Sequence, residues 1–350
     1  MENTPRNGVI TLDGSSESQH LWEDYVGGAP DASFYHRYAW KQINESEFGH
    51  RTFYLAHFEE GRVTGVFPLV LIDSRIFGRI LCSLPFLNYC GPSSQRSEAT
   101  ARLLAEACAI ADRESVSYLE IRSTQRCDDS LPVSTDKISL TVPLQQDPDS
   151  LWNDYTSKHR NNIRRAYKSG LRVEHGHLDR LDTFYDIMCH SWRALGTPIY
   201  RKRYFRSILE AFGDATRIFV VYHDDTPVAT AFNGYHNGTV EGMWAGGMPE
   251  HRRLQSNYVL YWEMIKHACE SGLTTFHLGR SSVDSGGETF KKKWGAEAHQ
   301  LYWQYYLPAG DEIPQLNVKN PKYQLAINTW RRLPLWATRM LGPLLSRSIP

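Results

Sequence analysis

The chain has 350 residues, of which 41% are apolar and 12% aromatic, a composition that excludes a disordered chain and allows two domains with cores of their own. Lys and Arg together number 39, as do Asp and Glu, so the net charge excludes a general attraction to nucleic acid or membrane and leaves only local patches. The six cysteines lack metal-ligand spacing, and we find neither a signal-peptide core nor an apolar run long enough to span a membrane. We therefore expect a cytoplasmic protein without a metal site.

The two halves of the chain contain the same succession of predicted elements. Each half has a hairpin with an acidic turn, a short aromatic strand, an amphipathic helix and a strand that ends in arginine. Arg122 and Arg280 therefore take the same place in the two copies. The predicted elements are 53–71, 83–92, 97–115 and 117–123 in the first copy, and 218–236, 242–250, 256–272 and 274–282 in the second.

This β-β-β-α-β order is the central part of the GNAT acyltransferase fold, and the rules of handedness and adjacency leave few other compact ways to wind it. We therefore predict an α/β fold with mixed sheets, made of two tandem GNAT-like units related by internal duplication. The first unit is expected over residues 1–150, the second over 151–315, and a basic amphipathic tail over 316–350. The alternative is two unrelated α/β domains whose hairpins coincide by chance.

Three segments carry a family resemblance: residues 34–92, the basic KHRNNIRRAYKSGLRVE at 158–174, and HLGRSS at 277–282 with FKKKWGAE at 290–297. They resemble the FemAB-related acyltransferases of the GNAT superfamily, including members associated with exosortase and exopolysaccharide systems. The resemblance covers about residues 30–310. It implies transfer of an aminoacyl or acyl group to an amine of a lipid- or nucleotide-linked saccharide or peptide precursor of the cell envelope, with exopolysaccharide modification preferred over peptidoglycan bridging.

The resemblance leaves the acyl donor open between aminoacyl-tRNA and acyl-coenzyme A. The helical arm common in members that use tRNA is absent, and residues 250–257 lack the paired glycines of a coenzyme A loop. Two alternatives remain: a coenzyme A dependent N-acetyltransferase acting on a small amine, and a non-catalytic pair of GNAT-like domains that binds glycans or acts as a scaffold.

The densest positive charge lies between Lys158 and Arg172, a stretch without acidic residues. Arg160, Arg164 and Lys168 are four residues apart and form one stripe on a helix. Guanidinium groups donate two hydrogen bonds to phosphate at once, so we expect this stripe to bind a phosphorylated or nucleotide-linked donor. The alternative is a solvated helix face that joins the two units.

A second group of candidates follows the last strand of the repeat. Arg280 stands at a predicted strand end, where α/β sheets bind ligands, and a polar loop follows it. Lys291 and Lys292 are expected to hold phosphate or carboxylate, or else to lie on an exposed helix turn. Trp294 is expected either as a binding platform or as a packing anchor.

A third group lies where the aromatic strands end. Gly246 allows close approach of a ligand to a splayed strand edge, and Asn88 and Tyr89 are expected to orient an amine or a leaving group. The alternative is a β-bulge with core packing.

No residue stands out as the general base, although Glu241, His251, Asp284 and Glu288 lie in the relevant part of the sequence. We expect positioning and electrostatics to dominate, with Tyr258, Asp284 and Tyr89 as the catalytic candidates. The predicted binding residues are Asn88, Arg160, Asn161, Arg164, Arg165, Lys168, Gly246, Asn257, Arg280, Ser281, Lys291, Lys292 and Trp294.

The C-terminal tail is basic and apolar at once. Residues 317–350 contain six basic and no acidic residues, and tryptophans and leucines lie among them. Such a segment can lie on an anionic membrane, so we expect residues 325–350 to contact the inner face of the membrane. The alternative is a helix docked on the body, because Pro334 and Pro343 interrupt any long helix.

Overall fold

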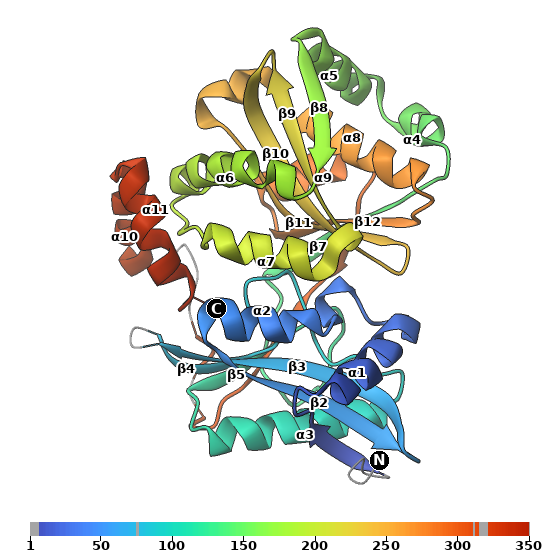
Figure 1. Ribbon diagram of the computed structural model, residues 1–350, viewed down its shortest axis with the longest axis vertical. Helices are drawn as coiled ribbons and strands as arrows, with labels where there is room; N and C mark the ends of the chain where they lie inside the picture. Colours follow the sequence, from blue (N-terminus) through green and yellow to red (C-terminus); the bar gives the residue numbers. More distant parts are fainter. Residues whose placement is uncertain (1–6, 75–76, 311, 315–320, 350) are drawn as a thin grey trace. The chain divides into compact units, whose positions relative to one another are not determined.

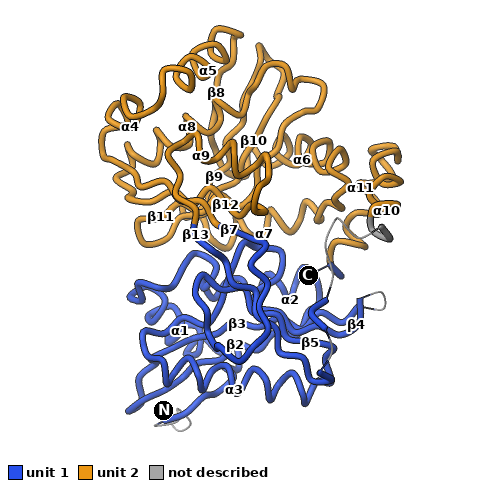
Figure 2. The backbone as a smooth tube through the Cα atoms, turned by 180° about the vertical axis from the view of Figure 1, so that it is seen from behind, with its two compact units in different colours: residues 1–138, 299–314, 348–350 blue, residues 139–298, 315–347 orange. Residues whose placement is uncertain are grey.

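Two seven-stranded mixed sheets carry the fold of the computed structural model, which describes residues 7–74, 77–310, 312–314 and 321–349 (Figure 1). Each sheet belongs to its own compact unit, coloured separately in Figure 2. The first unit comprises residues 1–138, 299–314 and 348–350, and the second comprises 139–298 and 315–347.

The two sheets have the same topology. The first has the order β1-β2-β3-β4-β5-β14-β6, and the second, read from its other edge, has the order β8-β9-β10-β11-β12-β7-β13. In both, an antiparallel hairpin is followed by a strand that pairs in parallel with its neighbour across the helix. The internal duplication is therefore confirmed, and Arg122 on β5 and Arg280 on β12 occupy equivalent strands. The strands of the first sheet are β1 (Gly8–Thr11), β2 (Arg51–Glu59), β3 (Arg62–Ser74), β4 (Gly78–Cys82), β5 (Tyr118–Ser123), β6 (Val133–Ser134) and β14 (Tyr302–Tyr306). Those of the second are β7 (Lys137–Pro143), β8 (Leu171–Gly176), β9 (Thr216–His223), β10 (Thr226–His236), β11 (Thr239–Gly247), β12 (Thr275–Ser282) and β13 (Glu297–Gln300).

One strand is exchanged between the two copies of the repeat. β7 follows the first copy along the chain but lies next to β12 in the second sheet, and β14 follows the second copy but pairs antiparallel with β5 in the first sheet. Each sheet is therefore completed by a strand from outside its own stretch of sequence.

Helices cover both faces of each sheet. In the first unit α3 places an apolar stripe that includes Leu103, Ala107 and Ile110 on one face, and α1 buries Trp22 and Val26 on the other. In the second unit α6 contacts β9, β10 and β11, and α8 contacts β8, β9 and β10. The helices of the first unit are α1 (Ser16–Gly28), α2 (Ala39–Phe48) and α3 (Ser97–Arg113). Those of the second are α4 (Pro148–Asp154), α5 (Ser157–Lys168), α6 (Leu181–Leu195), α7 (Lys202–Phe212), α8 (Asn257–Glu270), α9 (Gly286–Lys292), α10 (Pro321–Arg332) and α11 (Leu335–Ser346).

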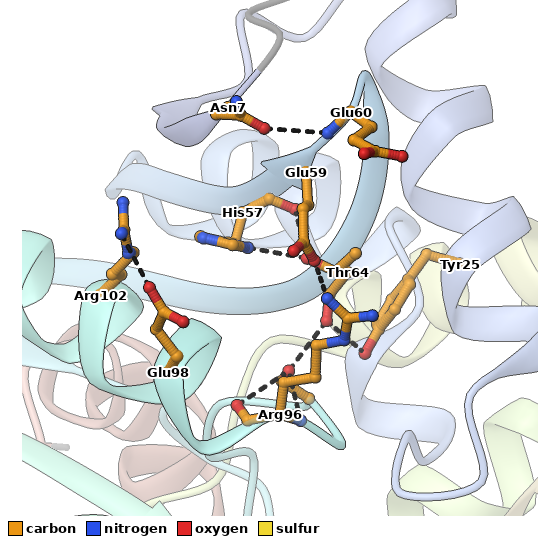
Figure 3. A network of polar contacts seen from close by, with 10 residues as sticks. Asn7, Tyr25, His57, Glu59, Glu60, Thr64, Arg96, Glu98 and Arg102 are labelled. Atoms are coloured by element: carbon orange, nitrogen blue, oxygen red, sulfur yellow. Dashed lines mark hydrogen bonds and ion pairs between the residues drawn. The ribbon is translucent and has the colours of Figure 1, made fainter.

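Polar contacts tie the β2–β3 hairpin to the helices of the first unit (Figure 3). Glu59 forms an ion pair with Arg96, which precedes α3. The hydroxyl of Tyr25 on α1 donates to the carbonyl oxygen of Thr64, at 3.4 Å. His57 Nδ1 lies 2.7 Å from the Thr64 hydroxyl oxygen. The predicted hairpin is thus held at its turn end by side chains as well as by its own ladder.

One predicted element is wrong. Residues 83–92 form no strand: β4 ends at Cys82, and Leu84 and Phe86 have φ values of 41° and 73°, which extended backbone does not allow. The segment instead lies along β5, where the Cys90 N–H donates to the Arg122 carbonyl at 2.9 Å. Its counterpart in the second copy does begin as a strand, because β11 runs on to Gly247.

Candidate active site

The second unit opens between two of its central strands. β11 and β12 pair in parallel over Thr239–Glu241 and Thr275–His277, although β11 continues to Gly247 and β12 to Ser282. An irregularity in the β10–β11 register lies at the same level, next to Asn233. A strand edge that leaves its neighbour can pair with an extended ligand through backbone N–H and C=O groups.

Three polar side chains meet at the point where β11 and β12 part. Glu241 and His277 are register partners, and His277 Nδ1 lies 3.8 Å from Glu241 Oε2. The Ser139 hydroxyl oxygen on β7 lies 2.8 Å from Nδ1 and 3.0 Å from Nε2 of the same ring. All three side chains are buried. A carboxylate beside an imidazole orients the ring and stabilises its protonated form, which is what a general base requires.

Sequence reasoning found only part of this group. It named Glu241 among four candidate bases but missed His277 and Ser139. The available signal was an ionisable residue inside each of two otherwise apolar strands, because a buried polar group in a strand needs a partner. The partner of the pair, Ser139, comes from the exchanged strand β7 and has no sequence signal of its own.

A cluster of cations surrounds the N-terminus of α8. Arg165 on α5 donates to Gln255 Oε1 at 2.9 Å and to Asn162 Oδ1 at 3.1 Å. Arg252 and Arg253 are exposed in the 3-10 turn that leads into the helix. Helix N-termini attract anions, and guanidinium groups add bidentate donors, so this end of α8 can hold phosphate.

The structure brings several predicted binding residues to this place. Asn162 Nδ2 donates to the Tyr258 hydroxyl at 3.3 Å, which joins α5 to the first turn of α8. Asn257 is the exposed first residue of α8, and its Oδ1 lies 4.0 Å from the position of a Cβ built on Gly247. The end of β11, α8 and α5 therefore meet at one site.

The predicted basic stripe on α5 has two different parts. Arg160 donates to the backbone carbonyls of Trp152, Asn153 and Tyr155 at 3.3, 2.8 and 2.7 Å, so its guanidinium closes the end of α4. Helix ends leave carbonyls without partners, and a cation satisfies them well. The remaining members of the stripe are exposed: Arg164, which lies over the Trp152 ring and donates to Asn161, and Lys168.

Lys291 is a buried clamp between α9 and β12. Its ammonium donates to the carbonyls of Gly279 and Arg280 at 2.8 and 2.9 Å. Burial, with a smaller contribution from the nearby Arg280 charge, lowers the pKa of Lys291 to about 8. Arg280 and Ser281 are half-buried at the end of β12, and Lys292 is exposed and paired with Glu288 at 2.6 Å.

Trp294 is a packing anchor. It is fully buried, and its ring lies 4.4 Å from the His159 ring and 5.7 Å from the Tyr155 ring, both edge to face. It also borders a pocket of about 440 Å³ between α4 and the ends of β7 and α9. That pocket is lined by Val142, Pro143, Leu144, Gln145, Leu151, Asp154, Tyr155, Thr156, Lys292, Lys293, Trp294 and Gly295.

Two further candidates have local structural partners. A Cβ on Gly246 would lie 2.8 Å from Ser191 Oγ and 2.9 Å from Met188 Sδ, so the missing side chain lets α6 approach β11. Asp284 is exposed with φ at 58°, and its N–H donates to Glu288 Oε2 at 2.7 Å.

Asn88 and Tyr89 belong to the first unit and form no group with the residues above within a unit. Asn88 Nδ2 donates to the Tyr35 hydroxyl at 2.8 Å, and the Tyr89 ring lies 5.2 Å from the Tyr35 ring, edge to face. Both side chains are buried.

Residues 157–292 match the family model of the acetyltransferase (GNAT) domain. No curated protein matches the chain. Among solved structures, the chain is similar to FemX, with 16% identity, a TM-score of 0.64 and coverage of 91% of this chain and 99% of that one. It is also similar to the C-terminal domain of a protein assigned as a lysylphosphatidylglycerol synthetase from Agrobacterium fabrum, with 13% identity, a TM-score of 0.55 and coverage of 83% and 92%. A tandem GNAT protein from the clavulanic acid biosynthesis pathway has 13% identity, a TM-score of 0.52 and coverage of 87% and 99%.

These comparisons agree with the duplicated topology: the fold is that of tandem GNAT proteins, and the segment matched by the family model contains the opening between β11 and β12. Over the described ranges, no helix is long and apolar enough to cross a membrane. The same ranges contain no cluster of three or more His, Cys, Asp or Glu side chains suited to a metal ion.

Proposed function

We propose that this chain, a GNAT-superfamily acyltransferase of FemAB-like build, transfers an aminoacyl or acyl group to an amine of a cell-envelope saccharide or peptide precursor. The observation that carries the proposal is the parting of β11 and β12 immediately beyond Glu241 and His277. An acyl donor that pairs with the free edge of β11 brings its carbonyl carbon toward this point.

The reaction needs one proton acceptor and one site of charge stabilisation. The acceptor's amine attacks the acyl carbon, a C–N bond forms, and the C–O bond of an ester or the C–S bond of a thioester breaks. His277, held between Glu241 and Ser139, takes the proton that the amine loses. Backbone N–H groups of the diverging strand are suited to the developing oxyanion. Tyr258, fixed by Asn162, is the proposed proton donor to the leaving group.

The cations at the N-terminus of α8 fit a donor that carries phosphate. Arg165, Arg252 and Arg253 supply guanidinium groups there, and coenzyme A and tRNA both present phosphate to such a site. Similarity to a protein assigned as a lysylphosphatidylglycerol synthetase supports an aminoacyl group and an envelope acceptor. The acetyltransferase family model supports instead a second candidate, N-acetylation of a small amine from acetyl-coenzyme A.

The test is a donor and acceptor matrix with the full-length chain. Acetyl-coenzyme A and aminoacyl-tRNA are each combined with a nucleotide-linked amino sugar, a lipid-linked peptide precursor and a free small amine, and products are identified by mass. We expect acylation of an envelope precursor, together with a rise in melting temperature with the donor that binds. Product with the free amine alone favours the second candidate. No donor binding and no product would mean a non-catalytic protein.

A further inference from the structure

The C-terminal helices α10 and α11 dock on α6 through small residues and backbone contacts. A Cβ on Gly342 would lie 3.0 Å from Ile199, so α11 approaches closely only because glycine stands there. Arg193 donates to the Leu333 carbonyl at 3.2 Å, and Arg339 forms an ion pair with Asp186 on α6. The predicted alternative of a helix docked on the body therefore describes the inner side of this segment.

The outer face of α11 carries the large apolar side chains. Trp336, Met340 and Leu344 are four residues apart and expose 68%, 60% and 51% of their surface, and Leu341 exposes 37%. The buried face consists instead of Ala337, Thr338, Gly342 and Ser346. A helix that only packs on a protein buries its large apolar residues, so the polarity of α11 is inverted relative to its docking.

Exposed apolar side chains concentrate in this part of the molecule. Among the described residues, nine large hydrophobic side chains are exposed, and six of them lie at or beyond position 325. A seventh, Leu195, ends α6 beside the segment, where its carbonyl accepts a hydrogen bond from Arg331 at 3.2 Å. Soluble monomers rarely expose such apolar groups together unless another surface covers them.

The charge of the segment selects the covering surface. Arg331, Arg332 and Arg347 are exposed, and no acidic residue follows Glu312 in the sequence. A second copy of this chain would oppose basic face to basic face, whereas an anionic lipid surface complements it. Tryptophan beside arginine is also the composition of helices that lie at the headgroup level.

We propose that the outer face of α11, formed by Trp336, Met340, Leu341 and Leu344 and flanked by exposed arginines, docks the protein on an anionic lipid bilayer. The segment lies on the bilayer with its apolar side chains between the headgroups. Trp330, which the sequence placed among the membrane residues, is buried and takes no part. The inference does not depend on the transferase reaction.

The test is sedimentation of the full-length chain with vesicles of phosphatidylcholine, with and without phosphatidylglycerol. We expect binding only to vesicles with phosphatidylglycerol, and weakening as salt rises. The triple variant Trp336→Ser/Met340→Ser/Leu344→Ser should lose binding. The matched variant Leu178→Ser/Val283→Ser, which removes exposed apolar side chains elsewhere, should bind as wild type.

Charge is tested separately, because removing apolar surface alone does not identify the lipid. Arg332→Gln and Arg347→Gln should each weaken binding about fivefold. Circular dichroism confirms that the variants are folded. Absence of binding at low salt would overturn the proposal, as would a wild-type dimer that the triple variant converts to a monomer, since the face would then join two copies.

Discussion

The two units repeat one fold but differ at the corresponding point of their sheets. In the first unit the register pair is Cys82 and Glu120, and the Glu120 carboxylate is bound by Arg122 at 2.6 Å and by the Tyr305 hydroxyl at 3.0 Å. In the second unit the pair is Glu241 and His277, and the neighbour on the exchanged strand is Ser139. One centre is a closed ion pair, and the other contains an imidazole that can accept a proton.

The space beyond each pair differs in the same sense. In the first unit residues 83–92 lie along β5, and a Cβ on Gly91 would lie 2.6 Å from Ser123 Oγ. In the second unit β11 runs on as a strand away from β12. The comparison teaches that duplication supplied two equivalent scaffolds, of which one was closed by its own chain and the other was kept open.

The largest expected effect separates the two centres by activity. Glu241→Gln and His277→Gln should each lower kcat/KM by about 10²–10⁴-fold, because they remove the proposed base while keeping the side-chain shape. The measurement is initial rate with the donor and acceptor identified above. Glu120→Gln is the matched control and should leave the rate per folded molecule unchanged. Normal turnover in both second-unit variants would place the chemistry elsewhere.

The next effect separates them by stability. Glu120→Gln leaves the buried Arg122 charge without its carboxylate and should lower the free energy of unfolding by about 3–5 kcal/mol. Urea denaturation measures the loss. The double variant Glu120→Leu/Arg122→Met removes both charges and should recover most of it. A first-unit centre that loses activity but not stability would contradict the assigned division.

The smallest effect concerns acid. Burial, together with the Lys293 charge, lowers the pKa of His159 in the second unit to about 4, below its usual value of 6.5. Between these values the unfolded chain binds the proton and the folded chain does not, so stability falls as pH falls from 6.5 to 4. The expected loss is on the order of 1–3 kcal/mol.

His159→Phe keeps a ring against Trp294 and should flatten this pH dependence. Burial also lowers the pKa of His175 and His267 in the second unit and of His57 in the first. Hydrogen exchange at pH 7 and pH 5 should therefore show the larger loss of protection in the second unit. Equal loss in both units would remove this difference between them.

Sequence reasoning found the elements of the repeat and part of the site. Hairpins, helices and the strands of Arg122 and Arg280 were predicted correctly, because apolar periodicity and turn residues are local signals. Residues 83–92 misled it, since their aromatic content suits a strand while the left-handed backbone at Leu84 and Phe86 does not. Arg160 was assigned to an anion site, because the sequence does not reveal that three carbonyls at the end of α4 engage its guanidinium.

By itself the sequence determined that the chain contains two copies of a β-β-β-α-β unit and that its C-terminal segment is basic and apolar. Only the tertiary structure decided which strand completes each sheet, because pairing of β7 with β12 and of β14 with β5 joins residues far apart in the chain and leaves no local pattern. The same long-range pairing assembles Ser139, Glu241 and His277, and the docking of α11 on α6 decides which of its faces remains exposed. Local periodicity specifies the elements, whereas burial and register between distant strands specify the site.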